Sequence, residues 1–93
     1  MSNVIADYEI LIQRFLDGMM SIEEFQATYL NRFKNEGFLD EQLFELLDEI
    51  FGDVDSFTTN QELVARNPGV YLDEAMLRER LRIAASRLSA LKK

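Results

Sequence analysis

Apolar residues recur along this chain at intervals of three and four, the spacing of a helix with one buried face. The first such segment runs from Asn3 to Leu16, and Gly18 is placed to end it. A second segment starts at Ser21 and Glu24, which have the spacing of a capping box, and it continues to Gly37. The inward positions predicted for these two helices are Ile5, Tyr8, Ile12 and Phe15, then Phe25, Tyr29 and Phe33.

Two further helices are predicted in the second half of the chain. Asp40 is a good N-cap for one of them, and Leu72 with Asp73 opens the other. The first has apolar residues at Leu43, Phe44, Leu47, Ile50, Phe51 and Val54. The second has Leu77, Leu81, Ala84, Leu88 and Leu91 on one side. Among these positions we expect to find in the core Phe44, Leu47, Ile50, Leu81 and Leu88.

A polar connection between Phe57 and Asp73 separates the last two of these helices. Connections of this length without secondary structure are uncommon in compact domains. Two interpretations stay open. Thr59 and Glu62 could form a capping box that begins a short helix over residues 61–66. The favoured interpretation is a plain crossover between two helices. Four helices joined by short links predict an all-α fold, an antiparallel four-helix bundle, with that short helix as an optional addition. At 93 residues we expect one domain, spanning residues 1–93.

The third predicted helix concentrates negative charge. The segment DEQLFELLDEIFGDVD, from Asp40 to Asp55, holds seven carboxylates and neither Lys nor Arg. On a helical wheel the apolar residues occupy one side, and the other side is almost purely carboxylate. This acidic face consists of Glu41, Glu45, Asp48, Glu49, Asp53 and Asp55.

A solvated surface is the plain interpretation of most charge runs, but two features of the acidic face favour a binding role. One row of it, Glu41, Glu45, Glu49 and Asp53, contains like charges at every fourth position. Each such pair costs about 0.2–0.5 kcal/mol of helix stability. Asp53 and Asp55 also lie at the C-terminal end of the helix, where the dipole favours cations. A partner rich in Lys and Arg would turn the repulsion into attraction, so we predict that this face binds a basic protein surface.

Charge is distributed unevenly along the chain. Residues 1–74 carry sixteen Asp and Glu against four Lys and Arg, net −12, whereas residues 75–93 carry one Glu against six Lys and Arg, net +5. A chain this acidic is not drawn to the phosphates of nucleic acid, and basic proteins are its more natural partners. Four arginines lie on the last helix: Arg78, Arg80, Arg82 and Arg87. The simplest interpretation is that they form its solvent-exposed face. The second interpretation is that they pair with carboxylates of neighbouring helices.

The residue types present exclude several chemistries. Without Cys or His the chain can form no disulfide, no zinc site and none of the usual nucleophile–base pairs. Asp53 and Asp55 begin like a calcium loop, but Thr58 stands where glycine is needed and Val64 where the bidentate glutamate is needed. No glycine-rich phosphate loop occurs. We therefore expect a protein that is not an enzyme and needs no metal, cofactor or small-molecule ligand.

The same features bear on location. The absence of Cys fits a reducing, cytoplasmic environment. The N-terminal residues MSNVIADYEI lack the basic and apolar regions of a signal peptide. No apolar run approaches the ~20 residues of a membrane span, so no membrane partner is expected.

The segment GDVDSF, residues 52–57, resembles the Asp-Ser-Leu attachment site of acyl carrier proteins, which are also small, acidic and four-helical. In those proteins the serine begins a long helix. Here Ser56 follows one, and the residues TTNQ that come next continue no apolar face. We expect Ser56 to be an ordinary polar residue at a helix end. An acyl-carrier-like protein stays an alternative, as does a generic acidic adaptor or nucleic-acid mimic.

Three segments, FLDGMMSIEEFQATYLNRF, LFELLDEIFGDVDSF and YLDEAMLRERLRIAASRL, follow one another in a recognisable order and spacing. Together, from about Ile12 to Leu88, they resemble the bacterial self-protective, colicin-D-like immunity proteins. The resemblance implies an antiparallel four-helix bundle that binds a cognate nuclease toxin domain, often a tRNA-cleaving one, and blocks its active cleft. It also implies relatives encoded beside colicins or contact-dependent inhibition toxins, with an acidic surface that mimics the charge of RNA. The positions that match are Asp48, Glu49, Asp53 and Asp55, with Glu45 and Glu41 farther along the helix.

Overall fold

The computed structural model describes residues 4–37 and 39–91, and this part of the chain forms five α-helices. They are α1 (Val4–Leu16), α2 (Ile22–Lys34), α3 (Glu41–Asp55), α4 (Gln61–Arg66) and α5 (Glu74–Leu91). The prediction of an all-α fold is confirmed. Asn3, the predicted start of the first helix, lies outside the described residues.

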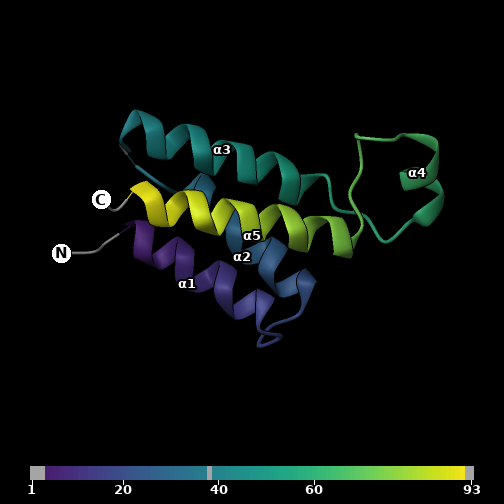
Figure 1. Ribbon diagram of the computed structural model, residues 1–93, viewed down its shortest axis with the longest axis horizontal. Coiled ribbons are helices and arrows are strands. Elements are labelled where there is room, and N and C mark those ends of the chain that lie inside the picture. Colours follow the sequence, from purple (N-terminus) through teal and green to yellow (C-terminus); the bar gives the residue numbers. More distant parts are fainter. Residues whose placement is uncertain (1–3, 38, 92–93) are drawn as a thin grey trace.

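The four long helices pack around one core. Helix α5 packs against α1 and α3, and α2 packs against the same two helices (Figure 1). In the view of Figure 1, α1 and α3 run from left to right and α5 runs from right to left between them. Helix α3 therefore lies in a ring of four helices, with α2 on one side of it and α5 on the other.

Aromatic residues fill the contact between α1 and α2. Phe15 stacks on Phe25 with ring centroids 4.7 Å apart, and Tyr8 meets Tyr29 edge-on at 5.5 Å. All four side chains are fully buried. The Tyr29 hydroxyl donates a hydrogen bond of 2.8 Å to the carbonyl of Leu47, which satisfies its polar end and ties α2 to α3.

The predicted core is correct except at one position. Leu47, Ile50, Leu81 and Leu88 are buried, but Phe44 is 48% exposed and the prediction for it is wrong. Helix α3 packs between two neighbours and is rotated so that Leu46 also faces inward. Phe44 is thereby left at the outer edge of the apolar face, where its ring stacks on that of Phe33 with the two centroids 5.8 Å apart. The apolar pattern allowed either rotation, and the positions of α2 and α5 decided it.

The predicted starts of α2 and α3 are correct, but α2 ends at Lys34 and not at the predicted Gly37. Ser21 and Glu24 form the capping box at the start of α2, and the Asp40 side chain accepts a hydrogen bond from the amide of Gln42 at the start of α3. Helix α1 ends at Leu16, and Gly18 follows two residues later with a φ of +78°, in the left-handed region that favours glycine. The amide of Met19 then donates to the carbonyl of Arg14 at 2.9 Å, which closes the last turn.

The long connection contains the short helix α4, so the interpretation as a plain crossover is wrong. Its predicted cap is also wrong. The side chain of Asn60, not Thr59, accepts hydrogen bonds from the amides of Glu62 and Leu63. Asn60 immediately precedes the helix, and asparagine is among the best N-cap residues.

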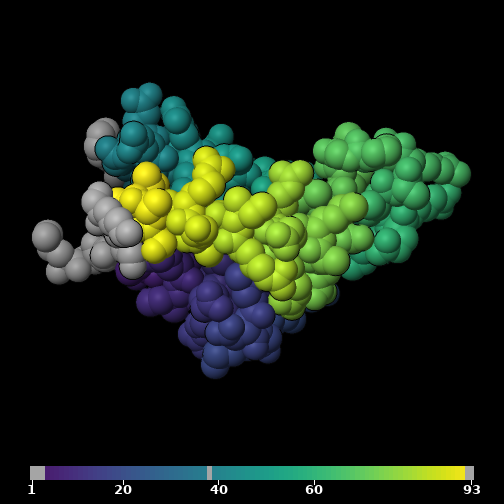
Figure 2. Space-filling model, in the orientation of Figure 1, coloured from purple at the N-terminus to yellow at the C-terminus, as the bar shows by residue number. Residues whose placement is uncertain are grey.

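Helix α4 stands apart from the other helices. It buries none of its residues, and it forms the projecting green lobe at the right of Figure 2. Two backbone hydrogen bonds close the base of this loop: the Thr58 amide donates to the Leu72 carbonyl at 2.9 Å, and the Leu72 amide donates to the Ser56 carbonyl at 3.0 Å. They fix the end of α3 beside the start of α5, which positions the surface described next.

Candidate partner-binding surface

The acidic face lies on the outside of α3. Because α2 and α5 cover the apolar side of the helix, the carboxylates point away from the core. Five of the six predicted residues are exposed, and Asp53 is half-buried. No basic residue occurs in the last turn of α3, so the unfavourable charge at its C-terminal end has no partner within the helix.

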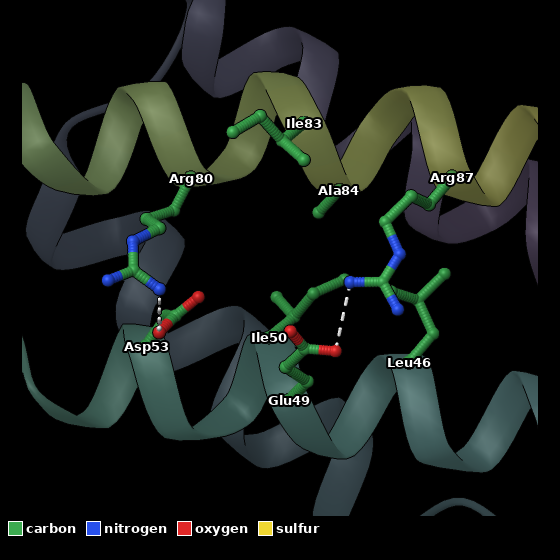
Figure 3. Close-up of a pocket in the computed structure, with 8 residues that line it drawn as sticks. All are labelled: Leu46, Glu49, Ile50, Asp53, Arg80, Ile83, Ala84 and Arg87. Atoms are coloured by element: carbon green, nitrogen blue, oxygen red, sulfur yellow. Dashed lines mark hydrogen bonds and ion pairs between the residues drawn. The ribbon is translucent and has the colours of Figure 1, made fainter.

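Two of the six carboxylates are paired with α5. Arg80 Nη1 lies 3.6 Å from Asp53 Oδ1, and Arg87 Nη1 lies 2.9 Å from Glu49 Oε2 (Figure 3). The second interpretation of the arginines, pairing across helices, is therefore confirmed for Arg80 and Arg87. The helical wheel is correct that α3 itself carries no Lys or Arg, because both of these cations come from α5. Within the described part of the chain, no ion pair involves Glu41, Glu45, Asp48 or Asp55.

Asp53 carries its charge in an unfavourable environment. Burial raises the pKa of its carboxyl above the ordinary value. The Arg80 guanidinium opposes this rise in pKa, and the Glu49 carboxylate adds to it. The net rise in pKa means that the ion pair with Arg80 does not fully compensate for the lost solvation.

This pKa shift predicts a specific pH dependence of stability. Because the folded-state pKa of Asp53 is raised, the folded protein binds this proton more readily than the unfolded chain. The contribution of Asp53 to the free energy of unfolding should therefore fall as pH rises from the ordinary aspartate pKa of about 3.9 through the raised folded value. Urea unfolding of wild type and Asp53→Asn across this range isolates the effect, since the other carboxylates cancel in the difference. The free energy of unfolding of the wild type should fall relative to that of Asp53→Asn as pH rises, and a relative increase would contradict the assignment.

A groove runs between α3 and α5 beneath these ion pairs (Figure 3). One hollow of about 250 Å³ lies between the two arginine–carboxylate pairs, and a second of about 430 Å³ adjoins it toward the end of α5. Leu46, Glu49 and Arg87 line both hollows. Glu45, Glu49 and Asp53 of the acidic face thus lie along one wall of an elongated depression. Arg80 and Arg87 lie along the other wall.

Comparison with known proteins decides the family. The family model for bacterial self-protective colicin-like immunity matches residues 1–88. The chain belongs to this family. No curated protein and no solved structure matches it. Membership indicates an immunity protein that neutralises a toxin, and it confirms the resemblance drawn from the three sequence segments.

Ser56 in this immunity-family protein is placed at the end of α3, as predicted. Its hydroxyl donates a 2.8 Å hydrogen bond to the carbonyl of Gly52 and so satisfies one of the open carbonyls at the helix end. This placement, after a helix and not at the start of one, does not favour a carrier attachment site.

No helix in residues 4–37 and 39–91 is long and apolar enough to cross a membrane. Over the same residues, no three carboxylates come together in a group that could hold a metal ion.

Arg78 has a structural role that the sequence did not reveal. Its Nη1 donates to the carbonyls of Phe15 and Leu16, each at 3.3 Å, and its guanidinium lies 4.4 Å from the centre of the Phe15 ring. Its Nε also pairs with Glu74 at 3.0 Å. The interpretation of Arg78 as a solvated residue is therefore wrong: it caps the end of α1 from α5. Arg82, which pairs with Glu79 on the surface, fits that interpretation.

Removing the Arg78 side chain should destabilise the protein by about 1–3 kcal/mol, because two carbonyls of α1 lose a charged donor and Phe15 loses a packing contact. Arg82→Ala is the matched control, since Arg82 lies one turn away and its only ion pair with a described residue is on the surface, with Glu79. That variant should change stability by less than about 0.5 kcal/mol. Urea unfolding of both variants checks this, and equal losses would show that Arg78 has no capping role.

Proposed function

We propose that this immunity-family protein binds a cognate nuclease toxin domain, one that cleaves tRNA, and covers its basic active-site cleft with the acidic face of α3. The observation that carries the proposal is the exposed set of carboxylates that form no ion pair with any other described residue, at Glu41, Glu45, Asp48 and Asp55. Nucleases hold RNA phosphates with Lys and Arg, so a surface that presents carboxylates along one helix competes for the same cations.

The proposal extends to the setting of the protein. We assign the four long helices to an antiparallel bundle, a single domain over residues 1–93, in which α4 is an addition to the crossover. Family membership and the direction of the chain in Figure 1 support this assignment. The protein would act in the cytoplasm, against the toxin of a colicin or contact-dependent inhibition system, and would require no cofactor.

Reconstitution with the toxin tests the proposal. The nuclease domain encoded beside the gene for this chain should form a stoichiometric complex with the purified protein. An equimolar amount of the protein should then abolish cleavage of tRNA by that domain. A toxin that keeps cleaving tRNA in the presence of excess folded protein would contradict the proposal. A complex with a toxin that does not cleave RNA would contradict only its nuclease part.

A further inference from the structure

The floor of the α3–α5 groove is apolar although its edges are charged. Leu46, Ile50 and Ala84 are buried at its base. Ile83 stands above them on α5 and is 53% exposed. A large aliphatic side chain with this exposure, next to a hollow whose base is already apolar, offers surface that a second apolar group could cover.

The ion pairs across the groove can be opened at little cost. Both members of the Arg87–Glu49 pair are more than half exposed, and the longer Arg80–Asp53 pair has its arginine exposed as well. Pairs of this kind contribute only about 0–1 kcal/mol, because water and salt compete with them. A cation brought by a partner can therefore replace the guanidinium of Arg80 or Arg87 at little loss of intramolecular energy.

The carboxylates around the groove favour a positively charged side chain from a partner over a negatively charged one. Glu45, which has no ion pair in the described residues, lines the second hollow together with Glu49. Asp53 lines the first hollow and is half-buried, and Arg80 does not fully compensate for the solvation that its carboxylate loses. Added positive charge is thus favoured along the α3 wall. An acidic group would meet the carboxylates at close range.

We propose that the α3–α5 groove is the binding site for an apolar side chain that is flanked by Lys or Arg on the surface of the toxin domain. The apolar group covers Ile83 and the floor, and the flanking cation takes the place of Arg80 at Asp53 or of Arg87 at Glu49. This inference rests on the proposed function and deepens it. It makes recognition depend on an apolar contact as well as on charge.

Two isoleucines of the chain provide a matched test. Ile83 and Ile10 are similarly exposed, at 53% and 57%, and both lie on helices, but only Ile83 lines the α3–α5 groove. Ile83→Gln should weaken binding of the toxin domain about tenfold, the effect of losing a partly buried aliphatic contact. Ile10→Gln should change the affinity less than about twofold. Neither change alters the charge, and thermal melts establish that both variants stay folded.

Short peptides test separately whether the groove requires both an apolar residue and flanking cations. The free protein is titrated with Ser-Lys-Leu-Lys-Ser, with Ser-Lys-Ser-Lys-Ser and with Ser-Glu-Leu-Glu-Ser while the methyl resonances of Leu46, Ile83 and Ala84 are followed. The first peptide should shift these resonances several-fold more than the second, and the third should leave them unchanged. Equal shifts with the first two peptides, or shifts centred on Ile10, would overturn the inference.

Failure of the groove and failure of the proposed function give different results. If the wild-type protein neutralises the toxin domain while Ile83→Gln and Ile10→Gln behave alike, the groove inference fails and the proposed function stands. If the wild-type protein does not bind the toxin domain, the proposed function fails, whatever the peptides show.

Discussion

Replacing by their amides the four carboxylates of the acidic face that have no ion pair with a described residue should weaken binding of the toxin domain by about 100-fold or more. The physical reason is that Lys or Arg of a partner need not displace any described cation from them. Within the described residues, none of the four makes an ion pair that would compete with a partner. The changes, made together, are Glu41→Gln, Glu45→Gln, Asp48→Asn and Asp55→Asn.

The same variant should be slightly more stable than the wild type when free, by some tenths of a kcal/mol. Glu41 and Glu45 repel one another at adjacent turns of α3, and Asp55 opposes the helix dipole. Binding titrations at low and high salt, with urea unfolding alongside, measure both effects. The difference in affinity should shrink as salt rises, because screening weakens the charge pairs that the wild type forms.

A control variant separates the acidic face from net charge alone. Four exposed carboxylates elsewhere on the surface can be replaced in the same way, at Asp17, Glu23, Glu62 and Glu79. This control changes the net charge equally but leaves α3 intact. It should weaken toxin binding only modestly, through slower association. If the two variants weaken binding equally, the charge of the whole protein matters and the acidic face is not the contact.

Leu47→Ala should destabilise the protein by about 2–5 kcal/mol, the usual loss when a fully buried leucine is truncated. Leu47 is completely buried on α3, at the position where the Tyr29 hydroxyl reaches its carbonyl. The cavity left by the change would open inside the contact between α2 and α3. A loss of this size is a large part of the stability of a domain this small.

Phe44→Ala is the informative comparison for Leu47→Ala, because the apolar pattern predicted both side chains to be buried. Phe44 is half-exposed and rests against Phe33, so its truncation should cost less than about 1.5 kcal/mol. Urea unfolding midpoints of the two variants measure the contrast. Equal losses would mean that α3 is rotated differently from the orientation described here.

The four long helices and most of their starts could be predicted because they depend on near neighbours in the chain. The capping box of α2 joins Ser21 to Glu24, and the Asp40 cap reaches Gln42. The turn after α1 needs only the left-handed glycine at position 18. The cap of α4 was predicted wrongly because two residues that can cap a helix, Thr59 and Asn60, are adjacent in the chain. In the structure Asn60 is the N-cap.

The acidic face was also predictable, since a helical wheel separates carboxylate from apolar positions without any knowledge of neighbouring helices. Pairing with arginines of the last helix was one open interpretation, but the sequence did not indicate which carboxylate each arginine would meet. Arg87 is 38 positions from Glu49 in sequence, and Arg78 is 63 positions from Phe15. Such pairs form only when α5 packs beside α3 and α1, and no periodicity along one helix contains that information.

The sequence by itself therefore determined an all-α protein whose third helix is apolar on one side and acidic on the other. These properties follow from the helical repeat and from contacts within a few residues. The tertiary structure alone decided the rotation of α3 that leaves Phe44 outside, the pairing of Glu49 and Asp53 with α5, and the apolar groove between the two helices. Each of these depends on how side chains from distant segments fit together in one packed core, which the order of residues along a single helix does not specify.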